Sequence, residues 1–346
     1  VEAPPPDETV VTTEIADPSA VATPGPVGPS STPASSAAFS PQPAAFDSVA
    51  MVKSPITIRG VYASRTPGAK GSRFGTGIGG GAAGSGDQKT EDAVVRALRW
   101  LKKNQQPDGS WNKNKVAMTG LAILTFLAHG ETPSDSKEFG ATVQKAIEYL
   151  LNAQNKQTGR IPGNYDHPIA TYALCEAYGM TLNPNVKEAA EKALALIIKG
   201  QHPTGGWTYN MDPDVQKPGS EPKDMVGKYR DDTSYMGWCA QALKAGHLAK
   251  MHVEGLDKAY KMTIKGFKKN ANPNGGFGYC GPGQGGLTAV GTLCMQLMGA
   301  ANEPEVRKSL DLMDQWVPSM EAKGPQGESL QYYFYYTTQC KFHAGG

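Results

Sequence analysis

The sequence predicts an all-α domain built from repeated pairs of helices, behind an extended N-terminal linker. Two observations predict the helix pairs. A short motif recurs with nearly fixed spacing, and each copy closes an amphipathic helix that is followed by a more uniformly apolar one. A third observation predicts the linker, because the first 50 residues show no apolar periodicity. Repeated units of this kind bury their apolar faces against one another.

The N-terminal part of the chain has the composition of a linker. Residues 1–50 hold 10 of the 26 prolines and six acidic residues, with no Lys or Arg. We therefore expect residues 1–53 to be a disordered Pro/Ala/Ser/Thr linker. Residues 54–88 follow as a short strand-like segment and a Gly-rich hinge. The hinge formally contains G-x-G-x-x-G, but no helix opens on it, so we expect no dinucleotide site there.

The charge and hydropathy of the sequence indicate which classes of binding partner to expect. The 346 residues carry a net charge of only +2, and no stripe of Lys and Arg interleaved with aromatic residues is present. We therefore expect no nucleic-acid partner. No apolar run is long enough to cross a bilayer. Membrane contact is thus expected only through an anchor upstream of this sequence, and the linker suggests an extracytoplasmic or membrane-tethered domain.

Residues 89–346 are predicted to form amphipathic and uniformly apolar helices in alternation, and this range is the expected repeat domain. Amphipathic helices are expected near 90–105, 139–154, 186–199, 256–269 and 303–316. Uniformly apolar helices are expected near 115–129, 167–180, 232–248, 285–299 and 328–344. A helix that is apolar all round is buried, whereas one with a polar face lies outside. Five outer–inner pairs should therefore surround a common axis.

The recurring motif consists of a basic residue, an aromatic residue or Leu, a Gln, a Gly and then a Trp. Its most regular residues are Gln105, Gly109 and Trp111 in the first copy, Gln154 in a looser second copy, and Gln201, Gly205 and Trp207 in the third. Pro and Gly after each Gln favour a tight turn between the two helices of a pair.

This motif resembles the QW motif of the prenyltransferase and squalene-cyclase repeat proteins, and the resemblance covers residues 89–346. It implies an α/α toroid, in which a ring of inner helices lies inside a ring of outer helices. It also implies a structural role for the motif, whose Gln and Trp tie an outer helix to the next inner one. The family's ring has six pairs. Only five are visible here, so the resemblance suggests a sixth pair truncated from this sequence.

The segment 229–234 opens the third inner helix and carries the main catalytic candidates. It resembles the Asp-x-Asp-Asp-Thr-Ala motif of squalene–hopene cyclases, whose middle Asp protonates an alkene. By this match Asp231 is the candidate acid and Asp232 its neighbour, while Tyr229 replaces the first Asp. The alternative for Asp232 is to cap the helix, because a carboxylate suits a helix N-terminus.

Aromatic residues on the inner helices are the candidates for a ligand cavity, since aromatic faces stabilise cations. The candidate cavity residues are Tyr229, Tyr235, Trp238, Tyr332, Tyr335 and His167. Core packing is the alternative for the aromatic residues, and packing or capping is the alternative for His167.

Other chemistries have weaker support. The segment from Cys280 to Gln284 resembles the thioester of complement-type toroids, but one residue too many separates Cys from Gln. Cys340 and His343 lie three residues apart, which alone is a weak zinc signal. We therefore predict no metal and no cofactor.

Three functions remain open, and with them the question of whether the protein is an enzyme. The first is a toroid that binds or cyclises an isoprenoid, an apolar small molecule, with Asp231 as acid, which would make it a terpene cyclase-like isomerase or lyase. The second is a non-catalytic toroid that binds a protein or glycan and is held on the linker. The third is a toroid similar to polysaccharide lyases. The first predicts a closed apolar cavity at Asp231, and the second a shallow polar centre with Asp232 used as a cap.

Overall fold

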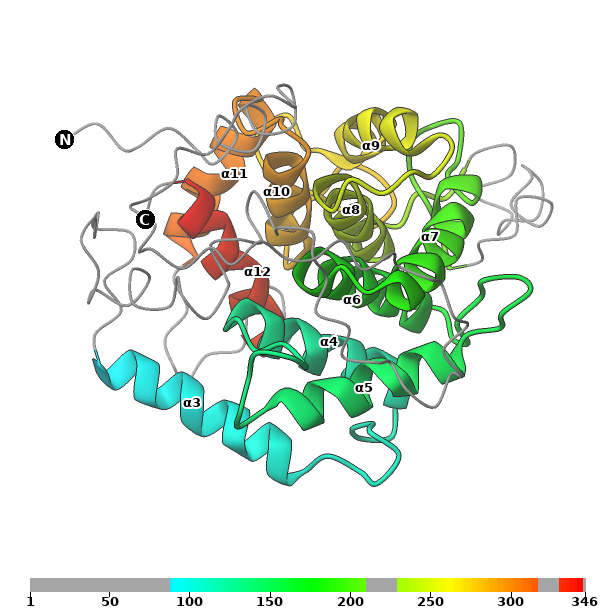
Figure 1. Ribbon diagram of the computed structural model, residues 1–346. Coiled ribbons are helices and arrows are strands. Elements are labelled where there is room, and N and C mark those ends of the chain that lie inside the picture. Colours follow the sequence, from blue (N-terminus) through cyan, green and yellow to red (C-terminus); the bar gives the residue numbers. More distant parts are fainter. Residues whose placement is uncertain (1–87, 210–228, 317–329, 345–346) are drawn as a thin grey trace, which may run out of the picture.

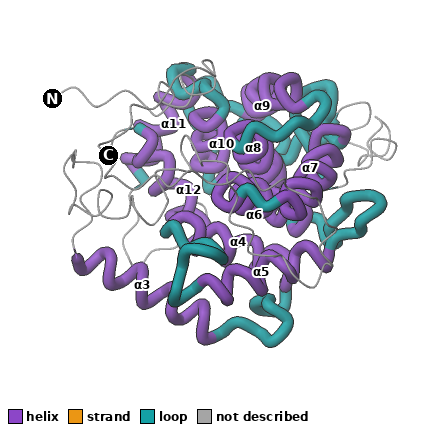
Figure 2. Tube along the Cα trace, viewed as in Figure 1, coloured by secondary structure: helices purple, strands orange, loops and turns teal. Residues whose placement is uncertain are grey.

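The computed structural model describes residues 88–209, 229–316 and 330–344. The expected linker (1–53) and the strand-like, Gly-rich segment (54–88) lie outside the described residues, except for residue 88. Figure 2 shows the described chain as helices joined by loops, and one isolated bridge pairs Ala271 with Phe277. The predicted all-α class is confirmed for this part of the chain.

The described ranges contain ten helices, which alternate between an outer and an inner position. The outer helices are α3 (Gln88–Lys103), α5 (Gly140–Ala153), α7 (Pro184–Lys199), α9 (Leu256–Asn270) and α11 (Pro304–Gln315). The inner helices are α4 (Lys115–Ala128), α6 (Asp166–Thr181), α8 (Thr233–Leu248), α10 (Leu287–Leu297) and α12 (Leu330–His343). Their ends lie within two residues of those expected from the sequence.

The inner helices pack against one another in chain order, from α4 through α6, α8 and α10 to α12. Each of α5, α7, α9 and α11 packs against the two inner helices that precede and follow it in the chain (Figure 1). This is the arrangement of an α/α toroid. Because all inner helices run in the same direction, their N-termini gather at one end, which we call the N-terminal rim.

Burial follows the sequence pattern. The inner helix α8 buries 13 of its 16 residues, whereas the outer helix α9 buries 6 of its 15. The small and apolar residues of α8 can pack on all sides, while the lysines of α9 need contact with water. No helix in the described ranges has both the length and the hydropathy of a membrane span.

The motif glutamines fasten each turn to the outer helix that follows it. In three copies the side-chain Nε2 donates to the carbonyl of the turn glycine and to a carbonyl of the next outer helix, at 2.8–3.0 Å. The glutamines and their acceptors are Gln105 with Gly109 and Thr142, Gln154 with Gly159 and Ala189, and Gln201 with Gly205 and Ala259. The resemblance implied a link to the next inner helix, but the bonds reach the next outer one, because the turn packs on that helix.

The motif tryptophans close the preceding outer helix. Trp111 Nε1 donates to Leu101 O at 2.8 Å, and Trp207 Nε1 donates to Ile197 O at 2.7 Å. Both acceptors lie near the C-terminus of an outer helix, where carbonyls lack helical partners. Both indoles are buried, so each tryptophan combines a helix cap with a core contact.

The turn glycines cannot carry a side chain. Gly205 has φ +94°, and a Cβ there would lie 2.1 Å from Met262 O in α9. Gly109 has φ +89° and would place a Cβ 2.3 Å from Lys145 O in α5. Glycine is needed for the left-handed backbone and for the close approach to the next outer helix.

The fourth turn lacks a motif glutamine, since Ala271 stands four residues before its glycine, Gly275. The missing amide is supplied from downstream, because Gln284 Nε2 donates to Gly275 O at 2.9 Å. Gln284 thus has a structural partner, which accounts for the residue that ended the thioester-like segment.

Candidate functional site

Asp231 lies at the N-terminal rim, just before α8, and is fully buried. Its Oδ1 accepts hydrogen bonds from His202 Nδ1 at 2.7 Å and Thr204 Oγ1 at 2.9 Å. Its Oδ2 accepts from Lys269 Nζ in α9 at 2.7 Å. The carboxylate therefore joins the turn after α7 to the end of α9.

The environment of Asp231 favours its ionised form. Burial acts to raise the pKa of the carboxyl group, but the hydrogen bonds from His202 and Lys269 and the charge of Lys269 outweigh it and hold the pKa below its usual range. Protonating an alkene requires a carboxylic acid that carries its proton. The hydrogen bonds around Asp231 therefore do not favour its predicted role as the acid.

Asp232 points the other way and caps α8. Its Oδ1 accepts from the backbone N–H of Ser234 at 2.9 Å and of Tyr235 at 3.2 Å, and from Ser234 Oγ at 2.6 Å. This is the capping arrangement that the sequence offered as an alternative. The other oxygen, Oδ2, is buried and has no hydrogen-bond partner among the described residues, although a buried carboxylate oxygen normally has one.

Four tyrosines, Tyr165, Tyr209, Tyr235 and Tyr279, gather around Asp232, and we call them the tyrosine cluster. The rings of Tyr165, Tyr209 and Tyr235 lie 5.5–5.7 Å apart, centroid to centroid. The hydroxyls of Tyr209 and Tyr279 are hydrogen-bonded to each other. Tyr165 Oη lies 2.6 Å from Ser234 Oγ. Three turns that precede different inner helices thus meet at one point.

Burial raises the pKa of all four tyrosines, and the negative charge of Asp232 adds to this effect at each of them. Their hydroxyls therefore keep their protons. The hydroxyl of Tyr235 is buried and, like Asp232 Oδ2, has no partner within the described part of the chain. Among the described residues, Asp232 Oδ2 and the Tyr235 hydroxyl thus lack a hydrogen bond of ordinary geometry, although the hydroxyls of Tyr209 and Tyr279 interact with the Asp232 carboxylate.

Arg230 covers the outer side of this cluster. Its guanidinium carbon lies 5.3 Å from the ring centre of Tyr279 and 5.8 Å from that of Tyr209. Nη2 also donates to Tyr279 Oη at 3.0 Å. Stacked cations of this kind stabilise aromatic pairs, and the guanidinium also interacts with the Cys280 side chain.

The predicted cavity residues divide between several places. Tyr235 belongs to the tyrosine cluster. Trp238 instead packs against the α12 rings of Tyr335 at 6.0 Å and Tyr336 at 5.9 Å, and Tyr332 joins Tyr336 at 5.0 Å. Three of the predicted aromatic residues therefore share a second group, between α8 and α12.

Two other candidates lie outside both groups. The ring of Tyr229 stacks on His202 at 4.8 Å, on the side of Asp231. His167 is fully buried, accepts from Ile161 N at 3.1 Å through Nδ1 and contacts Ala193 O in α7 at 3.2 Å through Nε2. It therefore faces the outer helix rather than the tyrosine cluster, which corresponds to the packing alternative.

Sequence reasoning missed Tyr165, Tyr209 and Tyr279. A signal for two of them was present, because Tyr209 and Tyr279 each stand two residues after the motif aromatic, Trp207 or Phe277. Because the copies of the motif fold alike, tyrosines at the same position in two copies lie at the same end of the toroid.

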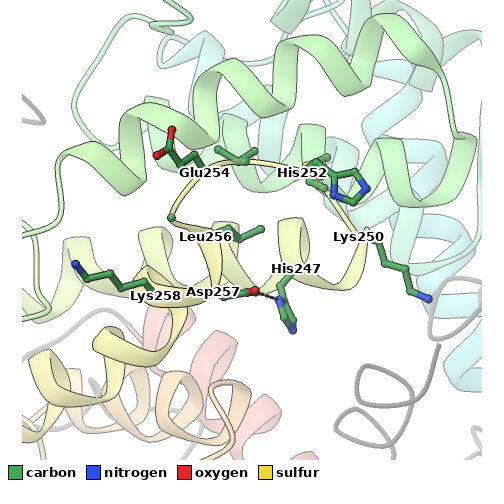
Figure 3. Close-up of a pocket in the computed structure, with 10 residues that line it drawn as sticks. His247, Lys250, His252, Glu254, Leu256, Asp257 and Lys258 are labelled. Carbon is green, nitrogen blue, oxygen red and sulfur yellow. Dashed lines mark ion pairs between the residues drawn. The ribbon is translucent and has the colours of Figure 1, made fainter.

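A separate hollow of about 630 Å³ lies at the opposite end of α8. Figure 3 shows His247 facing Asp257 there, and the two form an ion pair at 3.2 Å. Its lining includes cations and acids, such as Lys250, Lys258 and Glu254. Across the described ranges no three His, Cys, Asp or Glu side chains lie together as metal ligands would. The hollow shares no residue with the tyrosine cluster.

Comparison with known proteins shows the fold and a partial sequence similarity. No protein-family model matches the sequence. The chain is 28% identical over 144 residues to drimenyl diphosphate synthase from Streptomyces showdoensis, a match that covers 38% of this chain and 26% of that protein. The chain thus spans about a quarter of the length of this relative.

Two solved structures share the fold. A glycosyl hydrolase of family 88 from Bacteroides vulgatus superposes with a TM-score of 0.54 at 12% identity, covering 74% of this chain and 86% of that one. A polysaccharide lyase superposes with a TM-score of 0.56 at 13% identity, covering 74% and 85%. The α/α toroid is therefore common to this chain and to enzymes that act on carbohydrates.

Proposed function

We propose that this chain is a non-catalytic toroid that binds a glycan at the tyrosine cluster. The observation that carries the proposal is the state of the two aspartates at the rim. The Asp231 carboxylate accepts hydrogen bonds from His202 and Lys269. Asp232 Oδ2 is buried among the tyrosines, without a hydrogen bond of ordinary geometry to any described residue.

The chemistry of the cluster matches a sugar ring. One face of a pyranose is apolar and packs on tyrosine rings, while its hydroxyls can donate to Asp232 Oδ2 and bond to Tyr235 Oη. An unsatisfied buried acceptor costs about 1–3 kcal/mol, so a ligand that supplies the missing hydrogen bond gains affinity. An isoprenoid chain has no hydrogen-bond donor and leaves both groups unsatisfied.

Titration of oligosaccharides into the protein, followed by calorimetry, tests this proposal. We expect binding that falls at least about 10-fold, or about 1.4 kcal/mol, in Tyr279→Ala and in Asp232→Asn. The asparagine keeps an oxygen for the cap, so folding is preserved. Lys258→Ala, in the hollow at the other end of α8, is the matched control and should bind as the wild type does. Equal affinities of all variants, or no binding to any glycan, would reject the proposal.

A second candidate is isoprenoid binding, which the sequence similarity to drimenyl diphosphate synthase favours. Trp238, Tyr335 and Tyr336 would provide its aromatic wall. Native mass spectrometry of the purified protein separates the two candidates. A co-purified isoprenoid that is lost in Trp238→Ala, or a cyclised product that is absent from Asp231→Asn, would establish this second function.

A further inference from the structure

The first outer helix, α3, exposes an apolar face that the later outer helices bury. Trp100 is 62% exposed, and Ala93 and Ala97 are exposed as well. These residues follow one another four and three positions apart, so they lie on one side of the helix, and we call them the α3 face. Figure 1 shows α3 at the lower edge of the molecule.

The repeats allow this face to be compared position by position. Ala97 and Ala93 stand eight and twelve positions before the motif glutamine, Gln105. The matching residues of the next three outer helices are all buried, and they are Thr142 and Ala146 in α5, Ala189 and Ala193 in α7, and Ala259 and Thr263 in α9, counted from Ala271. The α3 face is thus a part of the repeat that is normally covered.

The preceding turn is what covers these positions. Its motif glutamine donates to the carbonyl at the position of Ala93, and its glycine lies against the carbonyl at the position of Arg96. The glutamine acceptors, at 2.8–3.0 Å, are Thr142 O, Ala189 O and Ala259 O. The carbonyls that a Cβ on the glycine would meet, at 2.1–2.7 Å, are Lys145 O, Lys192 O and Met262 O.

Each described turn is already packed in this way. The turns after α3, α5 and α7 lie on the next outer helix through the contacts just given. The turn after α9 lies on α11, where Gly276 N donates to Ser309 Oγ at 2.8 Å. A second copy of the described residues would bring the same occupied turns, so it would have none to place on α3.

We propose that the α3 face binds a separate protein chain that carries an α/α repeat, through a turn with a Gln four or five residues before a Gly. The partner's Gln would donate to Ala93 O, and its Gly would lie on Arg96 O. The turn would cover Ala97 and Trp100, and a tryptophan of this kind commonly anchors an interface. The proposal is independent of the glycan function, because the α3 face shares no residue with the tyrosine cluster.

A helical hairpin with the sequence of residues 140–181 is the probe, since it holds α5, the turn with Gln154 and Gly159, and α6. It contains no tryptophan, so the fluorescence of Trp100 in the full chain, taken as the difference from Trp100→Phe, reports binding. We expect a blue shift as the hairpin is added. Gln154→Ala in the hairpin should weaken binding about 10-fold, because a hydrogen bond to the face is lost.

Two variants of the full chain show where the hairpin binds. Ala97→Glu places a charge on the α3 face and should weaken binding at least about 10-fold. Ala195→Glu is the matched control, because Ala195 is an exposed alanine of another outer helix, α7. It should bind as the wild type does, and thermal unfolding establishes that both variants are folded.

A chimera tests the same contact without requiring the hairpin to fold alone. A copy of residues 140–183 is inserted directly before Gln88, which stands 17 positions before Gln105 as Pro184 does before Gln201. The copied turn then precedes α3 as the original precedes α7. We expect a blue shift of Trp100 and a higher Tm, since an added repeat contributes an interface. Gly159→Leu in the copy should abolish both effects.

The remaining outcomes would overturn the proposal. A Trp100 emission typical of a buried indole before any hairpin is added would show that another segment of the chain, or a second copy, covers the face. A blue shift in the chimera without binding of the hairpin would assign the face to a turn of the same polypeptide. Equal binding by Ala97→Glu, or no shift in either experiment, would show that the face does not fit such a turn.

Discussion

His202 Nδ1 and Asp231 Oδ1 lie 2.7 Å apart in a buried contact that joins two repeats. The pKa of Asp231 is lowered in the folded protein, so its carboxylate stabilises the fold above the unfolded-state pKa of about 3.9, and this contribution is lost as pH falls through the lower folded pKa. We expect Asp231→Asn to cost about 1–3 kcal/mol at pH 7 and to flatten the acid limb of the stability curve.

Urea unfolding from pH 2.5 to 7 measures this effect. Asp257→Asn is the control, because Asp257 is 80% exposed and its pair with His247 should contribute little. If the unfolding free energies of the wild type and Asp231→Asn fall equally steeply at acid pH, the assignment of an ionised Asp231 is wrong.

His167 should produce a second step, at higher pH. Burial lowers its pKa to about 4, from the usual value near 6.5. Between these values the unfolded chain binds the proton and the folded chain does not, so stability falls as pH decreases from about 6.5 to about 4, by about 3 kcal/mol in total. His167→Gln should remove this slope in urea unfolding. An unchanged slope would mean that the pKa of His167 is the same in the folded and unfolded chains, so that burial does not lower it.

Gly205→Ala should be strongly destabilising, since the added Cβ meets Met262 O at 2.1 Å and the backbone has φ +94°. The left-handed conformation alone costs about 1–2 kcal/mol, and the clash adds to it. Gly281→Ala is the control, because a Cβ at Gly281 meets nothing within 4 Å. Thermal unfolding should show a lower Tm for the first variant and nearly the wild-type Tm for the second, whereas similar values would refute the close turn.

Trp207→Phe tests the helix cap apart from the core contact. The phenyl ring stays buried but leaves Ile197 O without its donor, which should cost about 1–3 kcal/mol in unfolding free energy. Trp100→Phe is matched in chemistry but lies at a side chain that is 62% exposed. We expect it to change stability by less than about 0.5 kcal/mol. Equal effects would show that the indole N–H is unimportant.

Two substitutions of Asp232 should separate its role as a helix cap from its proposed role in ligand binding. Asp232→Ala removes the hydrogen bonds to Ser234 N and Tyr235 N and should cost about 1 kcal/mol. Asp232→Asn keeps a capping oxygen and should retain most of this stability. Chemical denaturation of both variants measures the difference, and an equal loss would mean that the negative charge, rather than the capping oxygen, stabilises α8.

The fold could be predicted because its determinants are local. The period of apolar residues places α9, a uniformly apolar run places α8, and the spacing from Gln201 to Trp207 places the turn between α7 and α8. The site could be predicted only in part. Asp231 and Asp232 stand side by side in the sequence, but the chain is extended before α8. Their side chains therefore point in opposite directions, one toward Lys269 and the other into the tyrosine cluster.

The tyrosine cluster itself comes from three turns and the first turn of α8, which are far apart in the sequence. Tyr165 and Tyr235 are 70 positions apart, and Tyr209 and Tyr279 are also 70 apart. Nothing in the local pattern of one turn indicates the residues of another. The direction of His167 depends in the same way on where α7 lies, because its Nε2 contacts Ala193 O.

The hydrogen bonds of the motif glutamines also set an order of events during synthesis. Gln105 bonds to a carbonyl 37 residues downstream, and Gln201 to one 58 residues downstream. At about 5–20 residues per second, a ribosome needs several seconds to deliver the acceptor for each finished turn. The newest repeat on a nascent chain is therefore always incomplete, and the growing toroid exposes an unfinished edge that advances with translation.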